Sequence, residues 1–160
     1  MLFRSVEAKD FDMIAMGRPE GPGCYCFANN VLRDVIKKLS SAYPYVIIDN
    51  EAGLENLSRR IVSKVDLLVM VADPSKNGID TIRRLHKLAL EMKIDFNKLC
   101  IFINRTRNGK LPEEAMSLKN ETEADSVISL PDNDELASLS EKGDPVIRLS
   151  TNNEVVGLID

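Results

Sequence analysis

The chain has 160 residues and a net charge of −4; 44% of its residues are apolar and 29% are charged. This apolar content excludes intrinsic disorder, and the mild acidity without a basic block argues against electrostatic binding of nucleic acid. The longest uninterrupted apolar run, residues 67–72, is far shorter than the ~18 residues of a membrane span. We therefore expect one domain over residues 1–160, with no nucleic-acid partner and no membrane partner.

The N-terminal residues and the cysteine count both predict a cytoplasmic protein. Charged side chains interrupt the first residues from Arg4 to Asp12, so no targeting signal is expected there. Three cysteines, an odd number, do not make a disulfide framework. A reducing compartment is therefore expected.

Apolar runs that predict strands alternate along the chain with patterns that predict helices. The runs lie at residues 11–16, 45–48, 67–72, 99–103 and 127–130, and most are continuous, as in strands covered on both faces. Helical spacing of apolar residues predicts helices at 31–39, 54–61, 79–92, 112–118 and 133–142, with Gly143 ending the last. Residues 155–159 are expected to begin one more helix. This alternation predicts an α/β fold with a doubly wound, mostly parallel sheet.

Candidate ligand-binding residues follow the predicted strands, because ligands of open α/β sheets bind outside the carboxyl ends of the strands. Asp49 follows the strand at 45–48 and could hold Mg²⁺ through a water molecule. Gly53 then opens a helix and could offer its N–H to a phosphate. Taken alone, these two residues are better explained by an ordinary aspartate turn followed by a glycine that starts a helix.

Two further strand ends carry polar residues. Asn104 and Arg105 follow the strand at 99–103, and the Asn104 amide offers both a donor and an acceptor to an adenine edge. Pro131 and Asp132 follow the strand at 127–130 and lead into a helix N-cap. Taken alone, both segments also fit ordinary polar turns.

The pair Cys24 and Cys26 follows a loop rich in glycine and proline at residues 17–23. Two thiolates at this spacing can bind one soft metal ion, but a tetrahedral structural site needs four ligands. A twofold homodimer would bring two such pairs together. The alternative is that both cysteines are merely small loop residues. Cys100, inside the strand at 99–103, is expected to be a buried, unreactive thiol.

These motifs together resemble a known family. Residues 16–26 (MGRPEGPGCYC), with Asn29 and Asn30 after them, strongly resemble the carbon monoxide dehydrogenase accessory ATPases. These are nickel-insertion proteins within the MinD/ParA-like group of P-loop ATPases, which also includes the nitrogenase iron protein. Residues 46–54 (VIIDNEAGL) are similar to that group's Walker B strand and switch II, and residues 104–105 and 130–132 are similar to its two adenine-side loops.

The resemblance implies roles for the nucleotide-site residues. Asp49 would hold Mg²⁺ through a water molecule, and Gly53 would sense the γ-phosphate of ATP. Asn104 would contact adenine, with Arg105 and the Pro131-Asp132 loop flanking the base. The fold implied is that of a P-loop NTPase of the MinD/ParA type.

The resemblance also implies a metal site and partners. Cys24 and Cys26 would bind Ni²⁺ or Zn²⁺ between the two subunits of a homodimer. ATP binding would favour the dimer, and hydrolysis would reset it, so that the nucleotide state is coupled to metal delivery into the carbon monoxide dehydrogenase apo-enzyme. ATP can shift that equilibrium only through contacts that it makes better in the dimer.

The chain departs from the family at the phosphate-binding loop. Its only Gly-Lys step, Gly109-Lys110, is followed by Leu111, and Asn104 stands where the motif's first glycine should be. We therefore expect that the family's N-terminal strand and P-loop are missing, and that this chain alone does not hydrolyse ATP. A separate N-terminal half is then a candidate partner.

Two alternative functions remain open at this point. The first is a non-catalytic metal-binding dimerisation module. The second is an electron carrier like the nitrogenase iron protein, with an Fe–S cluster at the dimer axis. The cysteine spacing argues against the cluster, because no cysteine follows Asp49 until Cys100.

Overall fold

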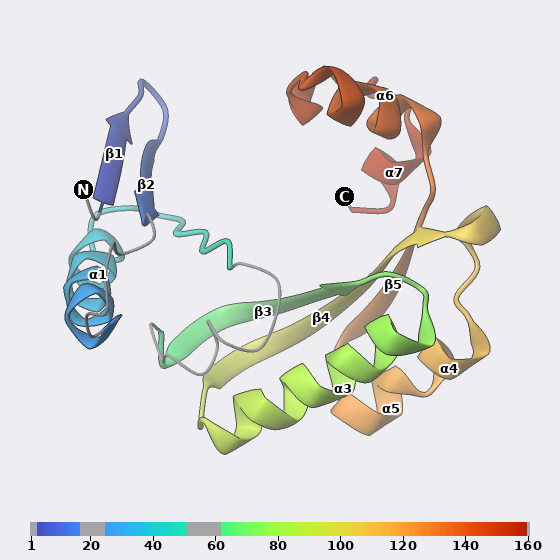
Figure 1. Cartoon of the computed structure of the whole chain (residues 1–160), viewed down its shortest axis with the longest axis horizontal. Coiled ribbons are helices and arrows are strands. Elements are labelled where there is room, and N and C mark those ends of the chain that lie inside the picture. The colour runs from blue at the N-terminus through green and yellow to red at the C-terminus, as the bar shows by residue number, and fades with distance from the viewer. Residues whose placement is uncertain (1–2, 17–24, 51–61, 160) are drawn as a thin grey trace. The chain divides into compact units, whose positions relative to one another are not determined.

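The computed structural model describes residues 3–16, 25–50 and 62–159, and within them the side chains of residues 3, 16 and 25–29 are not described. Internal contacts divide the chain into two units, Met1–Val62 and Ser63–Asp160, and we describe each by itself (Figure 1). Over the described ranges, no helix is long and apolar enough to cross a membrane.

The first unit contains a β-hairpin and a helix. β1 (Phe3–Glu7) pairs antiparallel with β2 (Asp12–Met16), and α1 (Tyr25–Leu39) follows. α1 confirms the helix predicted at 31–39, and β2 confirms most of the strand predicted at 11–16. β1 was not predicted, because its sequence FRSVE has only two apolar residues and no alternating pattern.

The strand predicted at 45–48 is wrong in this structure. Residues 45–50 have no regular secondary structure, and the Tyr45 and Ile47 side chains are 85% and 93% exposed. A strand needs a neighbouring strand to pair its backbone groups, and the described part of the chain pairs none with this segment. The helix predicted at 54–61 lies outside the described residues.

A three-stranded parallel sheet forms the centre of the second unit. Its strands are β3 (Lys64–Ala72), β4 (Asp95–Thr106) and β5 (Ser126–Pro131), in the order β3-β4-β5. They confirm the strands predicted at 67–72, 99–103 and 127–130. The α/β fold class with a parallel sheet is therefore confirmed.

Helices on one side of the sheet make the parallel connections (Figure 1). α3 (Lys76–Glu91) joins β3 to β4, and it confirms the helix predicted at 79–92. A short 3₁₀ turn, η1 (Arg107–Gly109), and the helices α4 (Glu113–Met116) and α5 (Leu118–Thr122) join β4 to β5. Two short helices that meet at Ser117 thus replace the single helix predicted at 112–118.

The core lies between this helical layer and one face of the sheet. Its fully or nearly buried side chains are Met70 of β3, Leu99, Ile101 and Ile103 of β4, Ile79, Ile82 and Ala89 of α3, and Leu118 of α5. Burying each large aliphatic side chain contributes about 2 kcal/mol. Apolar residues at helical spacing on α3 therefore meet alternate residues of the strands.

The opposite face of the sheet is apolar but uncovered within the described residues. Leu67, Val69 and Val71 of β3 are 52%, 45% and 57% exposed. The register pairs Val69 with Cys100 and Val71 with Phe102, so the same face continues across β4. The prediction of strands covered on both faces is thus not met here. Cys100 is half-buried rather than buried, and its Sγ lies 3.0 Å from the Ser126 hydroxyl.

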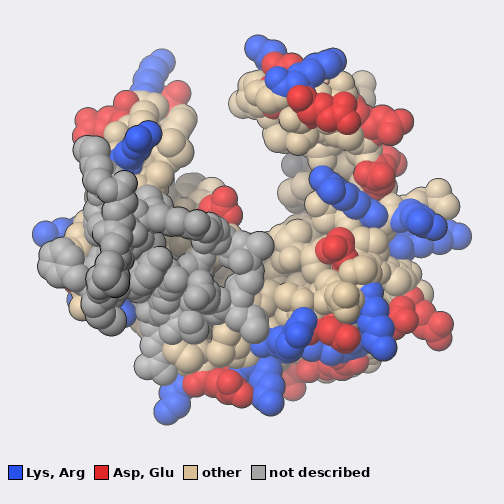
Figure 2. Space-filling view, in the orientation of Figure 1, with Lys and Arg blue, Asp and Glu red and all other residues tan. Residues whose placement is uncertain are grey.

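The outer face of the helical layer is charged, with acidic and basic side chains interspersed (Figure 2). Arg83 of α3 makes ion pairs with Asp80 at 2.8 Å and with Glu121 of α5 at 2.6 Å. These groups are partly exposed, so each pair contributes little by itself. Their geometry nevertheless fixes α5 beside α3.

A bulge distinguishes the carboxyl end of β4. Ile103 pairs with Ser129, but Thr106 pairs with Pro131, so β4 carries one extra residue between these pairs. Thr106 is fully buried; its hydroxyl donates to the Leu130 carbonyl at 3.0 Å and lies 2.7 Å from the Ser129 hydroxyl. This one side chain therefore holds the two strand ends together.

The last part of the chain contains α6 (Asp134–Lys142), the 3₁₀ turn η2 (Val146–Arg148) and α7 (Glu154–Gly157). The Asn133 side chain caps α6 by accepting from the Leu136 N–H at 3.0 Å, and Gly143 ends the helix with φ 67°. The helix predicted at 133–142 and its end at Gly143 are confirmed. α7 overlaps the helix predicted to begin at residues 155–159.

The Glu135 carboxylate attaches the last segment to α6. It accepts from the Ser150 N–H at 2.9 Å, the Ser150 hydroxyl at 2.8 Å and the Asn153 amide at 2.7 Å. These hydrogen bonds, of which that from Asn153 has the largest effect, lower the pKa of Glu135 below its ordinary value. The charged form is therefore the one that the fold stabilises.

We predict that the stability of the second unit falls in acid partly through Glu135. A folded-state pKa below the unfolded value gives stability that is present above the unfolded pKa and is lost as pH falls through the folded pKa. Urea midpoints measured from pH 7 to pH 3 should therefore fall, and Glu135→Gln should lower the midpoint at pH 7 and flatten this dependence. The control is Glu141→Gln, a change at an exposed residue of the same helix. If the urea midpoint of Glu135→Gln falls with pH as steeply as that of Glu141→Gln, the assignment is wrong.

We predict that Thr106→Val lowers the free energy of unfolding by about 1–3 kcal/mol, because it leaves the Leu130 carbonyl and the Ser129 hydroxyl without their buried partner. Chemical denaturation measures this change. The control is Thr81→Val, whose hydroxyl bonds to the Asn77 carbonyl on the exposed surface of α3 and should cost about 0.5 kcal/mol or less. Equal effects of the two substitutions would contradict the role of Thr106.

Candidate functional site

Four of the predicted site residues meet at the carboxyl edge of the sheet. Asn104 and Arg105 lie near the end of β4, while Pro131 ends β5 and Asp132 follows it. The Asp132 N–H donates to the Thr106 carbonyl at 3.1 Å. Because Thr106 directly follows Arg105, this bond connects the segment after β5 to the end of β4. The structure therefore brings these four residues together, as adjacent parallel strands require.

The bulge turns the backbone at Asn104 and Arg105. Arg105 has φ 58°, a left-handed conformation that costs a non-glycine residue about 1 kcal/mol. The Asn104 carbonyl oxygen Oδ1 accepts from the Arg105 N–H at 3.0 Å, so the side chain supports this turn. Its NH₂ group is not used in this hydrogen bond and can donate to a ligand, and the Arg105 side chain is exposed.

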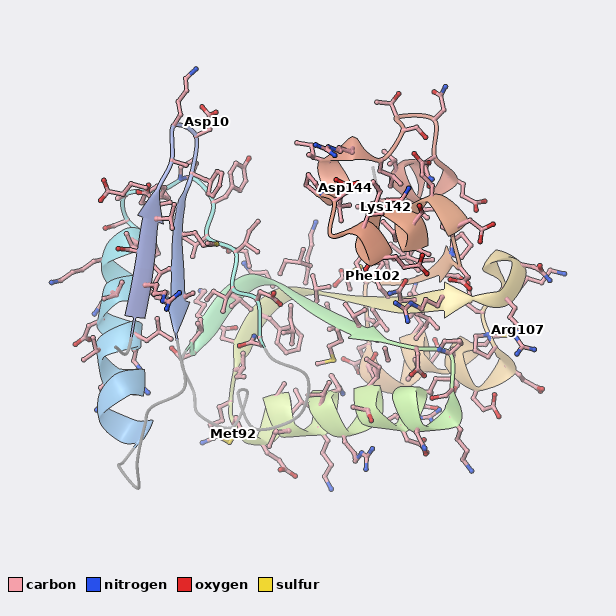
Figure 3. The ribbon with its side chains drawn as sticks, turned by 45° about the horizontal axis from the view of Figure 1, so that its top comes forward. Asp10, Met92, Phe102, Arg107, Lys142 and Asp144 are labelled. Atoms are coloured by element: carbon pink, nitrogen blue, oxygen red, sulfur yellow. The ribbon has the colours of Figure 1, made fainter. Side chains whose placement is uncertain are left out.

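The turn η1 continues from Thr106 along the same edge. Asn108 and Gly109 both have positive φ, at 56° and 65°. A Cβ on Gly109 would stand 4.0 Å from the Pro131 Cβ, an ordinary contact distance. The turn therefore packs beside the end of β5, and it carries Arg107 past the end of the sheet (Figure 3).

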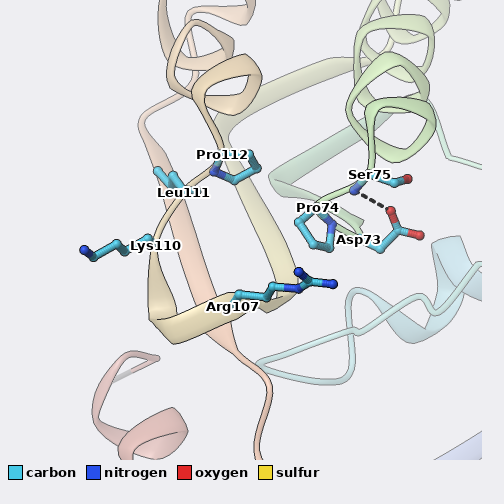
Figure 4. A pocket seen from close by; sticks show the side chains of 7 residues that line it. All are labelled: Asp73, Pro74, Ser75, Arg107, Lys110, Leu111 and Pro112. Atoms are coloured by element: carbon cyan, nitrogen blue, oxygen red, sulfur yellow. Dashed lines mark hydrogen bonds between the residues drawn. The ribbon is translucent and has the colours of Figure 1, made fainter.

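A pocket of about 560 Å³ lies between η1 and the end of β3 (Figure 4). Its polar lining residues are Asp73, Ser75, Arg107 and Lys110, and its apolar ones are Pro74, Leu111 and Pro112. Sequence reasoning missed these residues. The signal was present, because Asp73 directly follows the strand predicted at 67–72 just as Asn104 follows the next one.

Asp73 is held rigidly at this pocket. Its Oδ1 accepts from the Ser75 N–H at 2.8 Å, and hydrogen bonds from the Ser75 hydroxyl and N–H lower the pKa of this carboxyl. Gly78 makes the arrangement possible, since a Cβ there would stand 2.5 Å from the Asp73 carbonyl oxygen and 2.6 Å from Oδ1. The pocket therefore contains a fixed, ionised carboxylate.

A second pocket, of about 450 Å³, includes residues at the start of β4 and near the end of α3, Phe96 and Leu90 among them. It contains His86, Glu123 and Asp125. His86 is half-buried, and burial lowers its pKa. These residues lie away from the edge at which ligands of parallel sheets bind.

The remaining predicted site residues give less information. Asp49 belongs to the first unit and is exposed. Gly53 and Cys24 lie outside the described residues, and Cys26 lies in α1 with its side chain not described. Within the described part of the chain, no group of three or more His, Cys, Asp or Glu residues could hold a metal ion. The cysteine pair therefore stays a prediction.

Comparison with known proteins finds several homologues, although no family model matches. An uncharacterized ATP-binding protein of Methanocaldococcus jannaschii is 42% identical over 153 residues, which cover 94% of this chain and 59% of the relative. The carbon monoxide dehydrogenase accessory protein CooC of Rhodospirillum rubrum is 31% identical over 86 residues, 53% of this chain and 32% of that protein. The septum site-determining protein MinD of Thermotoga maritima is 24% identical, over 73% of this chain and 45% of its own.

Among solved structures, the MinD cell division protein of Aquifex aeolicus superposes with a TM-score of 0.65 at 19% identity, over 82% of this chain and 57% of that one. The chain thus spans about three fifths or less of the length of each of these four proteins. The likeness to the Aquifex structure confirms the fold expected from the sequence. The chain is therefore a homologue of ATP-binding proteins and of the MinD and CooC proteins, and its fold is that of MinD.

Proposed function

We propose that this chain supplies the adenine-binding side of an ATP site in a MinD/ParA-like protein. The observation that carries the proposal is the meeting of Asn104-Arg105 with Pro131-Asp132 at two adjacent strand ends. The Asn104 NH₂ group can donate to an adenine ring nitrogen, because only its carbonyl oxygen is used within the turn. Arg105 and Asp132, both exposed, would flank that position.

The relatives support the same function. The M. jannaschii protein whose name describes it as ATP-binding shares 42% identity over almost the whole of this chain. A homologue at this identity supports a similar ligand, and the strained turn at Arg105 is of the kind that functional sites retain.

The phosphate side of the site would come from a further segment, either of a longer polypeptide or of a separate N-terminal half. Two features of the second unit support this. The outer edge of β3 has no neighbouring strand in the described ranges, and Leu67, Val69 and Val71 expose apolar surface beside it. A parallel strand with its crossover helix would pair that edge and cover that face. Asp49 would then hold Mg²⁺ through water, since a carboxylate is a ligand that Mg²⁺ prefers, and Gly53 would lie near the γ-phosphate.

The more specific function that we propose is nickel insertion into carbon monoxide dehydrogenase, in the cytoplasm. The 31% identity with CooC and the sequence of residues 16–26 support it. Cys24 and Cys26 supply the soft donors that Ni²⁺ or Zn²⁺ accepts, and a homodimer would supply four of them. The dehydrogenase apo-enzyme would receive the metal ion as cargo.

We predict that the full chain binds Mg·ATP weakly, with a Kd of about 1 mM, through its adenine side alone. In an NMR titration of ¹⁵N-labelled chain, amide signals of residues 104–109 and 131–133 should shift. Asn104→Ala should weaken binding about tenfold through the lost hydrogen bond. Asn97→Ala, at the other end of the same strand, is the control and should change nothing. Shifts elsewhere, or equal behaviour of the two variants, would overturn the proposed site.

We predict that the full chain binds one Zn²⁺ or Ni²⁺ ion per two chains and that the metal favours the dimer. Metal titration with analytical ultracentrifugation measures both quantities. Cys24→Ser and Cys26→Ser should each abolish binding, whereas Cys100→Ser should retain it. Binding that survives both substitutions would exclude the cysteine site, and a brown, visibly absorbing protein after anaerobic iron–sulfide reconstitution would favour a cluster instead.

A further inference from the structure

The sequence contains two Asn-Gly pairs, Asn77-Gly78 in α3 and Asn108-Gly109 in η1. An asparagine is chemically labile when glycine follows it, because glycine has no Cβ to shield its backbone nitrogen. That nitrogen can attack the side-chain carbonyl of the asparagine if the backbone between the two residues is free to rotate. Both asparagines are exposed, so the two pairs differ chiefly in how firmly their backbones are held.

The first turn of α3 holds the Asn77-Gly78 backbone firmly. The Gly78 N–H donates to the Ser75 hydroxyl at 3.0 Å, which caps the helix, and the backbone carbonyl of Asn77 accepts from the Thr81 hydroxyl at 2.7 Å. Gly78 also packs closely against Asp73, since a Cβ on Gly78 would stand 2.5 Å from the Asp73 carbonyl oxygen. Rotation of the backbone between Asn77 and Gly78 therefore requires the cap and the first helical turn to open.

The Asn108-Gly109 backbone is held much less firmly. The Lys110 N–H closes the turn by donating to the Arg107 carbonyl at 3.3 Å, which is long for a hydrogen bond between backbone groups. Within the described part of the chain, the Asn108 side chain makes no hydrogen bond. Asn108 has φ 56° and ψ 28°, a left-handed conformation whose strain is relieved when the backbone rotates. Opening this turn therefore costs less free energy than opening the start of α3.

We propose that Asn108 is a site of spontaneous deamidation and that the fold protects Asn77 from the same reaction. The Gly109 backbone nitrogen forms a bond to Asn108 Cγ, the Cγ–Nδ2 bond breaks, and ammonia leaves with the proton that the Gly109 nitrogen gives up. Water then adds to one of the two carbonyls of the resulting succinimide ring. Opening of the ring yields either aspartate or isoaspartate, in which the backbone runs through the former side-chain Cγ.

The reaction changes the carboxyl edge of the sheet in charge and in shape. Arg107 and Lys110 flank the pair in the sequence and line the pocket, so a negative charge is added between two cations of η1 and its end. Isoaspartate also adds a methylene group to the backbone of η1, the turn that brings Gly109 to Pro131. The amide NMR signal of Asp132, which directly follows Pro131, should therefore shift as the protein ages.

The test measures deamidation of the full chain at both pairs in one sample, in mildly alkaline buffer at physiological temperature. A lysine-specific protease releases residues 77–87 and 99–110 as separate peptides, and fragment ions distinguish Asn108 from Asn104 in the second peptide. A sample unfolded in urea gives the reference rate of each pair without the fold. In the folded chain, Asn108 should react within about threefold of its reference rate, whereas Asn77 should react at least about tenfold more slowly than its own.

Ser75→Ala tests the physical reason for the difference. Removal of the cap should speed the reaction of Asn77 about fivefold, and Asn108 in the same variant is the internal control, whose rate should not change. Asn108→Ser should abolish the reaction in the peptide 99–110. Equal protection of the two asparagines, or a faster reaction at Asn77, would overturn the proposal, and the wild-type rates decide this even if the Ser75 variant does not fold. An Asp132 amide signal that stays in place while Asn108 reacts would overturn the effect on the edge of the sheet.

Discussion

The candidate site depends on one buried hydroxyl. Thr106 hydrogen-bonds to the end of β5 from the end of β4, and its backbone carbonyl also accepts from the Asp132 N–H. These bonds fix the register after the bulge, so that the extra residue in β4 is accommodated at Asn104 and Arg105 rather than spread along the strand. The left-handed Arg105 is tolerated because both sides of the turn are anchored. The parallel pairing of β4 and β5 brings the two polar segments to a common edge, and this hydroxyl adds a side-chain bond between them.

The charges of the pocket follow from the same parallel geometry. Parallel strands deliver all their carboxyl ends to one edge, so the polar residues that follow β3, β4 and β5 are gathered there whatever their separation in the chain. Asp73 is held there by the first turn of α3, and Arg107 by the turn after the bulge. The proposed adenine side and the adjoining pocket can thus be understood as one continuous polar edge above an apolar core.

Sequence patterns predicted the second unit well, because long apolar runs and helix caps are local signals. The caps at Asn133 and Gly143 and the strand that contains Ile101 are examples. The pattern at 45–48 was equally apolar, yet an apolar run becomes a strand only when another strand pairs with it. Asn104 and Pro131 could be placed at strand ends from sequence. Asp73 and Arg107 could not be brought together in the same way, because the bulge and η1 position Arg107 through positive-φ residues that no periodicity shows.

The edge of β3 that no described strand pairs also has a consequence for the aggregation of such a chain in a cell. Both charged residues of β3, Lys64 and Asp66, lie among its first three residues, and the strand has no proline, so the rest of that edge lacks the charges and kinks that usually keep sheets from joining. Any extended apolar peptide could add to it, including the same strand of another copy. The lifetime of the chain would then depend on a kinetic competition, in which the correct segment must pair with β3 faster than identical edges meet at the prevailing concentration.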